Sequence, residues 1–427
     1  MVYCTSRTGG KTHREPIGMP WRYSLRCFNC HTEYSPRETR YHCEKCGGLL
    51  EAKFQLPRLK RPPWKDRSIG VWKYRELLPI DTEQHIVTLN EGGTGLHRCQ
   101  RLGKELGLKR LYVKNEGENP TGSFKDRGMT VAVSKARELG KKKLVCASTG
   151  NTAASLSAYC ARAGLDCFVL VPKGKVAEGK MLQVLIHGAR IFQAEGDFDA
   201  AMDSVVQLTN KRRAFYLMNS INPFRLEGQK TLAYEVCDQL DGEVPDSLVL
   251  PVGNGGNISA MWKGFGEFQT LGVTKARPRM IGVQAEGAAP IAKAVKRKQD
   301  RIEPVTNPRT IASAIRIGSP VNWMKVLHAI NESHGNAETV SDKEILEAQR
   351  NLASKEGIFV EPASAASIAG LRKNREAGKI DRSDLVVCVT TGHGLKDPSV
   401  VDYLPKHEGY TLKTTQLDWI GRLERTL

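Results

Sequence analysis

An α/β fold with two open, mostly parallel, twisted sheets is predicted by the order of sequence patterns after about Ile86. Short β-branched runs alternate there with helical patterns, as in RLYVKNE, KDRGMTVAVSKARELG and KLVCAS, and this order is typical of right-handed βαβ units. Later runs such as CFVLVP and DLVVCVTTG are apolar almost throughout, as strands covered on both faces are. Because 427 residues are too many for one ordinary core, we expect two or three domains.

Four of the 11 cysteines form two closely spaced pairs near the N-terminus. CFNC and CEKC contain Cys27, Cys30, Cys43 and Cys46, with 12 residues between the pairs. Two CxxC pairs can supply four thiolates to one tetrahedral zinc ion. We therefore expect a small zinc-ribbon-like module at residues 22–55 that holds a structural zinc; four unliganded cysteines are the alternative.

A basic, proline-containing stretch separates this module from the α/β body. Residues 56–79, LPRLKRPPWKDRSIGVWKYRELLP, are typical of an extended connector, and we expect Trp64 and Trp72 to pack against the body. The predicted division is a basic N-terminal extension with the module at 1–60 and the body at 61–427. Within the body we expect a large domain at about 80–125 and 226–427, and a smaller inserted domain at about 126–225.

Composition and charge limit the classes of function. Hydrophobic residues make up 40% of the chain, and no run approaches the roughly 18 apolar residues of a membrane helix. The first 20 residues contain no apolar segment typical of a secretory signal, so we expect a cytoplasmic protein without a membrane partner.

The net charge of +18 is concentrated toward the N-terminus. Residues 1–80 carry 16 Lys and Arg against 7 Asp and Glu, which is half of the excess. A nucleic-acid-binding ribbon is therefore the rival hypothesis for the module. The segment between the cysteine pairs has no concentrated basic run, so we favour a structural role and expect no nucleic-acid partner.

One lysine stands between a turn and the predicted start of a helix. In ENPTGSFKDRGMT, residues 118–130, NPTGS predicts a turn, Ser123 is the expected N-cap, and the helix continues from Lys125 to about Gly140. A lysine that is held on a rigid element and partly removed from water can condense with pyridoxal phosphate. Taken alone, this pattern does not distinguish Lys125 from a solvated surface charge.

Three glycine-containing turns follow predicted strands. GNGGN follows DSLVLPV, STGNTAAS follows KLVCA, and TTGHGLKD follows DLVVCV. Such a turn can be merely a tight connection, but it also lets backbone N–H groups close around a phosphate at a helix N-terminus. Because ligands of open α/β sheets collect at the carboxyl ends of the strands, we expect the three turns to share one crevice.

The same segments carry a family resemblance. ENPTGSFKDRG, STGNTAAS, PVGNGGNISAMWKGF, EGIFVEPASAAS and TTGHGLKDP together closely resemble the threonine synthases, in the tryptophan-synthase-β-like, fold-type-II group of pyridoxal-phosphate enzymes. The resemblance extends from about Tyr23 to Pro398 and includes the paired CxxC. It implies that pyridoxal 5′-phosphate lies in the crevice between the two α/β domains, and we also expect a homodimer.

The resemblance assigns roles to residues of this chain. Lys125 would bind the cofactor covalently and then move protons between Cα, Cβ and C4′. Asn151 would hydrogen-bond to the 3′-oxygen of the pyridine ring, and Thr391 would meet the ring nitrogen. The cofactor phosphate would be held by the backbone of Gly253, Asn254, Gly255, Gly256 and Asn257.

A second phosphate, on the substrate, is expected at the segment NSINPFRLEGQK. The candidates for substrate binding are Thr152, Asn219, Ser220 and Arg225. A guanidinium fork matches the geometry of a phosphate group, which favours Arg225. The alternatives are a surface ion pair for Arg225 and a structural strand-end turn for Asn219.

The activity implied is that of a carbon–oxygen lyase acting on phosphates. It would convert O-phospho-L-homoserine and water to L-threonine and phosphate by γ-elimination and β-addition of water. A serine/threonine dehydratase would use the same lysine without a leaving phosphate, and a cysteate-synthase-like enzyme would take O-phosphoserine. A nucleic-acid-binding zinc-ribbon protein on an inactive enzyme scaffold is the alternative from a different class.

Overall fold

The computed structural model describes residues 21–173, 178–195, 204–209 and 215–403. Residues up to Asp397 form one unit, and Pro398–Leu427 forms another, of which the structure describes the short 3-10 helix Pro398–Tyr403. The first 20 residues of the predicted N-terminal extension lie outside the described residues. No helix in the described ranges is long and apolar enough to cross a membrane.

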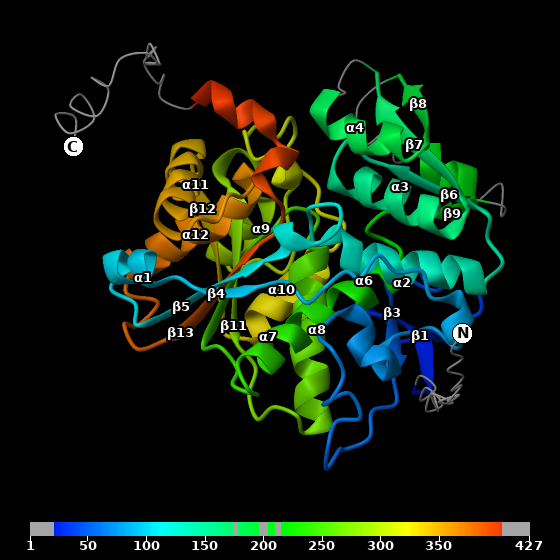
Figure 1. Ribbon diagram of the computed structural model, residues 1–427, viewed down its shortest axis with the longest axis horizontal. Coiled ribbons are helices and arrows are strands. Elements are labelled where there is room, and N and C mark those ends of the chain that lie inside the picture. The colour runs from blue at the N-terminus through cyan, green and yellow to red at the C-terminus, as the bar shows by residue number, and fades with distance from the viewer. Residues whose placement is uncertain (1–20, 174–177, 196–203, 210–214, 404–427) are drawn as a thin grey trace, which may run out of the picture. The chain divides into compact units, whose positions relative to one another are not determined.

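The larger sheet of the described chain has six strands (Figure 1). In spatial order they are β12 (Asn336–Val340), β11 (Arg279–Ala285), β10 (Ser247–Pro251), β13 (Leu385–Thr390), β5 (Arg110–Asn115) and β4 (Leu96–Arg98). Only β4 runs antiparallel to its neighbour. β4 lies at one edge of the sheet, so the remaining five strands are all parallel to their neighbours. Parallel strands are what the apolar runs in the sequence predict.

Helices cover both faces of this sheet because successive strand residues point to opposite sides. Val386 and Cys388 belong to one hydrophobic cluster, whereas Val387 and Val389 belong to another. The first cluster includes α1 (Gln100–Leu106), α11 (Asp342–Glu356) and α12 (Pro362–Glu376). The second includes α7 (Thr231–Gln239), α8 (Gly256–Leu271), α9 (Pro290–Lys296) and α10 (Trp323–Glu332).

The smaller sheet has four parallel strands in the order β8 (Arg190–Ala194), β7 (Asp166–Pro172), β6 (Lys143–Ala147) and β9 (Phe215–Leu217). Around it lie α2 (Lys125–Glu138), α3 (Asn151–Ala163), α4 (Glu178–Ile186) and α6 (Pro223–Gln229). The two parallel-rich sheets confirm the predicted α/β fold class. All strands of the smaller sheet fall within the predicted insertion at 126–225, while the domain boundaries themselves stay a prediction.

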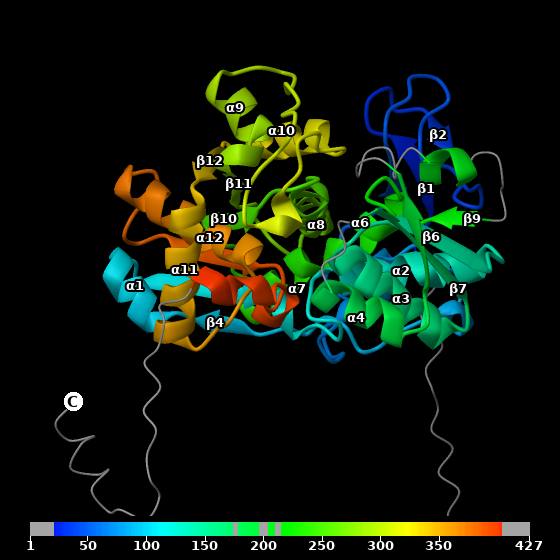
Figure 2. The same cartoon turned by 90° about the horizontal axis from the view of Figure 1, so that it is seen from above.

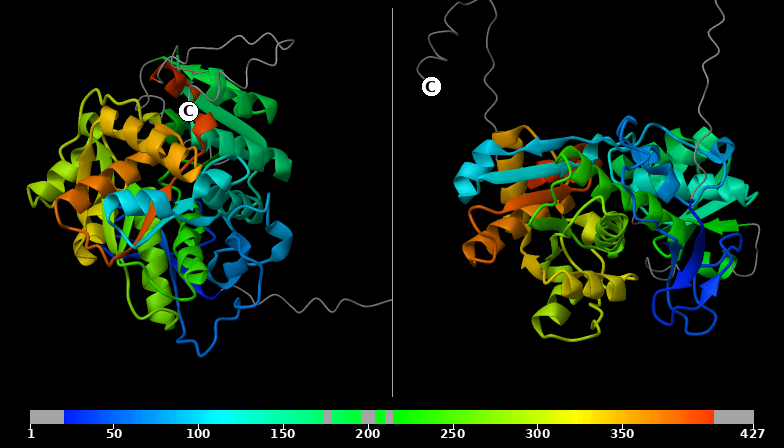
Figure 3. Two further views of the ribbon diagram at one scale, coloured as in Figure 1. Left: turned by 60° about the vertical axis from the view of Figure 1, so that its left-hand side comes forward. Right: turned by 90° about the horizontal axis from the view of Figure 1, so that it is seen from below.

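The N-terminal module is a three-stranded antiparallel sheet of β2 (Glu33–Tyr34), β1 (Tyr23–Cys27) and β3 (Leu50–Phe54). It lies beside α6 and β9 (Figures 2 and 3). On its β3 edge, the ammonium of Lys325 donates to the Leu50 carbonyl at 3.2 Å, and Lys263 donates to the Ala52 carbonyl. Two lysines of the body, the buried Lys325 and the partly exposed Lys263, therefore satisfy backbone acceptors of the module.

The connector packs on the body, as predicted. Trp64 is 1% exposed and stacks on Phe268, with 5.8 Å between the ring centroids. The indole N–H of Trp72 donates to the Thr130 hydroxyl at 2.9 Å. Because both aromatic side chains contact helices of the body, the connector is anchored to the body at these two points.

Candidate functional site

The end of β13 holds the start of α2. The backbone N–H of Phe124 donates to the Thr391 carbonyl at 3.0 Å, and Ser123 pairs with Gly392 in an isolated β-bridge. The expectation that Ser123 caps the helix is wrong: Phe124 occupies the N-cap position, and the buried Ser123 Oγ has no hydrogen-bond partner. The bridge to Gly392 therefore determines where Lys125, the first residue of α2, is placed.

Lys125 lies in an environment that favours its neutral form. Loss of solvation and, second, the positive charge of Arg225 lower the pKa of Lys125 to about 7, while the Glu361 carboxylate opposes this shift. Its Nζ lies 4.0 Å from the centroid of the Phe124 ring. A lysine that is partly neutral near pH 7 can act as a nucleophile and as a base.

Asn151, the first residue of α3, contacts Glu361, the carboxylate that acts on Lys125. Its Nδ2 lies 3.1 Å from each carboxylate oxygen of Glu361, and both side chains are buried. A Cβ at Gly392 would lie 2.7 Å from Glu361 Oε1, so only glycine leaves room for this pair. Glu361 lies in the segment EGIFVEPASAAS, and the sequence patterns predict no role for it.

Thr391 is held by a second residue that the sequence reasoning missed. Its hydroxyl lies 2.9 Å from the Ser364 hydroxyl, and Ser364 Oγ also accepts from the backbone N–H groups of Thr391 and Gly392 at 2.8 Å. Three hydrogen bonds to one serine fix the turn after β13. Contact of the Thr391 hydroxyl with the ring nitrogen of the cofactor stays a prediction.

The glycine-rich turn after β10 has the properties of an anion cradle. Gly255 adopts φ 80°, and a Cβ there would lie 2.4 Å from Val326 Cγ2, so the turn requires glycine. Both amide atoms of the buried Asn257 lack partners, as do those of Asn322, whose backbone N–H donates to the Asn254 carbonyl at 3.0 Å. Buried amides without partners are costly, and a phosphate bound at the α8 N-terminus would satisfy them.

Among the substrate candidates, Arg225 is buried and not part of a surface ion pair. It is 2% exposed, its Nη1 donates to the Met218 carbonyl at 3.0 Å, and its Nε has no partner. Burial lowers the pKa of Arg225 to about 10. A guanidinium held in this way has N–H capacity left for an anion.

The side chain of Asn219 links two strands, in addition to its predicted role in substrate binding. Its side-chain amide exchanges hydrogen bonds with the backbone of Ala147, at 2.9 Å and 2.8 Å, and so ties the end of β9 to the end of β6. Thr152 and Ser220 are half-buried at the adjoining strand ends. Substrate binding by these three residues stays a prediction.

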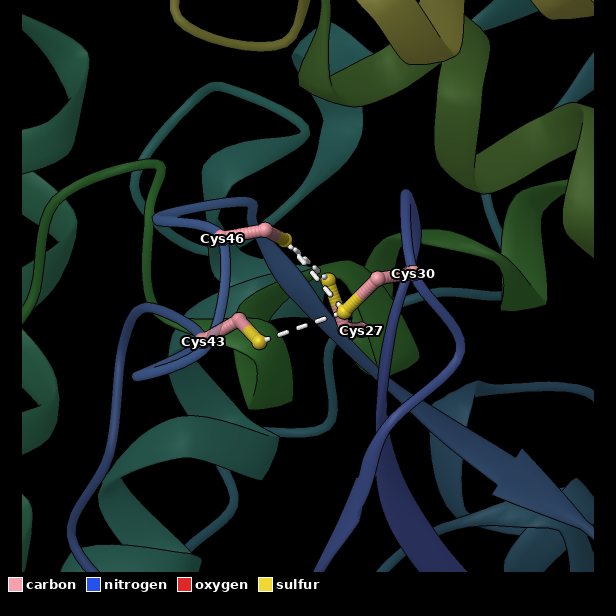
Figure 4. A group of neighbouring side chains, drawn as sticks. All are labelled: Cys27, Cys30, Cys43 and Cys46. Atoms are coloured by element: carbon pink, nitrogen blue, oxygen red, sulfur yellow. Dashed lines mark hydrogen bonds between the residues drawn. The ribbon is translucent and has the colours of Figure 1, made fainter.

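The four cysteines of the module converge, as the paired motif predicts (Figure 4). Their sulfur atoms lie within 4.8 Å of one another, with 3.4 Å between Cys27 and Cys46 and 3.5 Å between Cys30 and Cys43. This donor set and its spacing fit a tetrahedral zinc ion with four thiolate ligands.

Comparison with known proteins identifies the class to which this fold and site belong. The model of the pyridoxal-phosphate dependent enzyme family matches residues 87–392. Threonine synthase of Methanocaldococcus jannaschii is 58% identical, over 87% of this chain and 93% of the relative. Threonine synthase of Mycobacterium tuberculosis is 48% identical, over 80% of this chain and 91% of the relative. The chain belongs to the pyridoxal-phosphate dependent enzyme family and, within it, to the threonine synthases.

Solved structures share the fold at low sequence identity. The processed form of threonine deaminase isoform 2 from Solanum lycopersicum has a TM-score of 0.62 and 22% identity, covering 73% of this chain and 88% of that one. Maize serine racemase has a TM-score of 0.63 and 19% identity, covering 78% and 93%. These similarities support the fold-type-II architecture.

Proposed function

We propose that this threonine synthase converts O-phospho-L-homoserine and water to L-threonine and phosphate. The observation that carries the substrate assignment is Arg225: a buried guanidinium with an unpartnered Nε, close enough to Lys125 to lower its pKa. A buried guanidinium near a half-buried lysine favours a substrate that brings negative charge. A phosphorylated amino acid brings the charge of its phosphate in addition to its α-carboxylate, whereas a serine or threonine substrate of a dehydratase brings the carboxylate alone.

Lys125 carries the proton transfers in this proposal. Bound pyridoxal phosphate supplies an electron sink for negative charge at the substrate α-carbon. With a pKa of about 7, the Lys125 amine can accept a proton near neutral pH and return it at a neighbouring carbon. Its position at the first residue of a helix anchored to β13 keeps the amine close to the substrate.

The remaining residues bind and orient. The turn at Gly253–Asn257 and the unpartnered amides of Asn257 and Asn322 would hold the cofactor phosphate. Asn151 and Thr391 would contact the ring from the α3 and β13 ends. Arg225, with Ser220 and Thr152 nearby, would hold the substrate phosphate and retain it after it leaves.

Release of phosphate and threonine from O-phospho-L-homoserine tests the activity. Wild type should release both, and Lys125→Ala should lose at least about 10³-fold in kcat, since covalent catalysis and proton transfer are lost together. Lys143→Ala, which removes an exposed lysine on β6, is the matched control and should keep full activity. Faster turnover of O-phospho-L-serine with sulfite, or no loss in Lys125→Ala, contradicts the proposal.

We also propose that the cysteine module binds one structural zinc ion. The convergence of four sulfur atoms supports it. Metal analysis should find one zinc per chain in wild type and none in Cys43→Ser, while Cys99→Ser, at a buried cysteine of the body, should retain the metal. Wild type purified without zinc, with other metals also absent, contradicts this assignment.

A cytoplasmic location and a homodimeric state are proposals that rest on the family resemblance. Sedimentation equilibrium of the full chain should give twice the mass of 47.3 kDa. Fractionation of cells that express the native gene should recover the enzyme in the cytoplasm. A single-chain mass or an enzyme in another compartment contradicts the respective proposal.

A further inference from the structure

Glu361 is a buried carboxylate whose contacts are not those its position in the fold would predict. It occupies the N-cap of α12, where an acidic side chain ordinarily accepts from the first backbone N–H groups of the helix. Its carboxylate makes no such capping bond. It turns instead toward Asn151, with both oxygens 3.1 Å from Nδ2, at 1% exposure.

Burial of the Glu361 carboxylate costs free energy, and the surrounding backbone holds it in one orientation. Removing a charged group from water disfavours folding unless the charge is compensated, and helix capping would have offered cheaper compensation. The backbone around Glu361 is nevertheless firmly held: its N–H donates to the Gly392 carbonyl at 3.0 Å, and its carbonyl accepts from Ser364 N–H at 2.9 Å. Gly392 leaves the space that the carboxylate occupies. The fold therefore directs this carboxylate toward Asn151.

We propose that Glu361 is a positioning residue for the cofactor, which orients the Asn151 amide and places a negative charge beside Lys125. The inference deepens the proposed function and rests on the same cofactor site. A carboxylate only accepts hydrogen bonds, so it requires that the amide nitrogen of Asn151, and not its oxygen, face Glu361. The second N–H of Nδ2 is then available to an oxygen of the cofactor ring.

The charge of Glu361 has a second consequence, at Lys125. Two charged groups act on this lysine from different elements: Arg225 of α6, which disfavours its protonated form, and Glu361 before α12, which favours it. Because a nearby negative charge stabilises a cation, Glu361 should keep the nitrogen that links lysine and cofactor protonated to higher pH. In the cofactor-bound enzyme, Glu361 would therefore keep the Lys125 nitrogen protonated into the neutral range.

The test uses the visible absorbance of the lysine-bound cofactor in the full chain, titrated with pH. Glu361→Gln keeps a hydrogen-bond acceptor but removes the charge, so the pH midpoint of the spectral change should fall by at least about one unit, while the dissociation constant for pyridoxal phosphate changes less than about threefold. Glu361→Ala also frees the Asn151 amide and should weaken cofactor binding by about tenfold. Glu267→Gln removes a buried carboxylate of α8 that pairs with Lys230 and serves as the control, without a spectral shift.

An unchanged midpoint in Glu361→Gln, with the variant folded and loaded with cofactor, overturns the proposal. So does an equal shift in Glu267→Gln, because the effect would then be one of buried charge in general. If Glu361→Gln is purified without cofactor, the dissociation constant of its apoenzyme for pyridoxal phosphate is measured instead. A loss of affinity no greater than that of Glu267→Gln then also overturns the proposal. Failure of the proposed function looks different: wild type would show the titrating band but would not turn over O-phospho-L-homoserine.

Discussion

Two groups of buried charges in this chain differ in how they are compensated. In the first, which we call the Arg127 network, Arg127 pairs with Glu116 at 2.6 Å and Glu235 at 2.7 Å, and Lys114 pairs with Glu235 at 2.8 Å, all at 0% side-chain exposure. Burial by itself would raise the pKa of Glu235, but Arg127 and Lys114 lower it to about 2. In the second, at the crevice, burial lowers the pKa of Lys125 to about 7 and that of Arg225 to about 10.

The difference separates charges that maintain the fold from charges that await a ligand. In the Arg127 network every ion has an opposite ion, and the carboxylates also bind the loop before β4, where Gly93 N–H donates to Glu235 at 2.9 Å. Around Lys125, Arg225 and Glu361 act in opposite directions, and Arg225 Nε has no hydrogen-bond partner. Removing one partner of a buried ion pair destabilises the native state. A site in which a buried guanidinium keeps an unpartnered N–H is instead stabilised by a bound anion.

The largest effect should come from breaking the paired network. Arg127→Met leaves the buried carboxylates of Glu116 and Glu235 without their main partner and should lower the free energy of unfolding by about 3–5 kcal/mol. Urea unfolding of the apoenzyme measures it. A loss below about 1 kcal/mol would mean that the network is not what holds this region together.

The corresponding change at the crevice should leave the fold intact. Arg225→Met removes a buried cation that lacks full compensation, so thermal stability of the apoenzyme should stay equal or rise. Loss of a charged hydrogen bond to the substrate phosphate should reduce kcat/KM for O-phospho-L-homoserine by about 10–100-fold. Destabilisation as large as that in Arg127→Met would erase the distinction between the two groups.

Two asparagines allow the same comparison, between a partnered and an unpartnered buried group, for neutral side chains. Asn219→Ala breaks the amide pair with Ala147 and should cost about 1–2 kcal/mol of apoenzyme stability. Asn257→Ala removes an amide with no partner and should cost less than about 0.5 kcal/mol, but should weaken cofactor or phosphate binding. Chemical unfolding with and without 5′-phosphate ligands checks both; the reverse order of stabilities contradicts the assignment.

The smallest effect concerns pH. The neutral amine of Lys125 reacts with the cofactor, and its pKa of about 7 in the folded protein lies below the ordinary lysine value of 10.5. The rate of apoenzyme reconstitution should therefore rise with pH and level off above about pH 7–8. In Arg225→Met the nearby positive charge is gone, so the midpoint should move to higher pH. Stopped-flow absorbance gives both profiles, and a wild-type rate that keeps rising to pH 10 contradicts the lowered pKa.

What the sequence could predict follows from how local each signal is. The strand pattern and the paired CxxC depend on neighbouring residues, and they predicted the sheets and the cysteine cluster. Ser123 failed as an N-cap because a bridge to Gly392, far away in sequence, decides its role. Glu361 and Ser364 were not predicted as site residues, since their function depends on side chains from α3 and β13 that only the folded chain brings to them.

The contacts between lysines of the body and strand β3 mean that the body depends on the module for part of its hydrogen bonding. A gene shortened to begin at residue 61 would remove the carbonyls of Leu50 and Ala52, which accept from Lys325 and Lys263, and the Phe54 ring that lies 4.3 Å from Lys230. Three ammonium groups would then lose contacts that the first strands supply. A ribbon exchanged from a distant relative would therefore have to place backbone carbonyls within reach of Lys263 on α8 and Lys325 on α10.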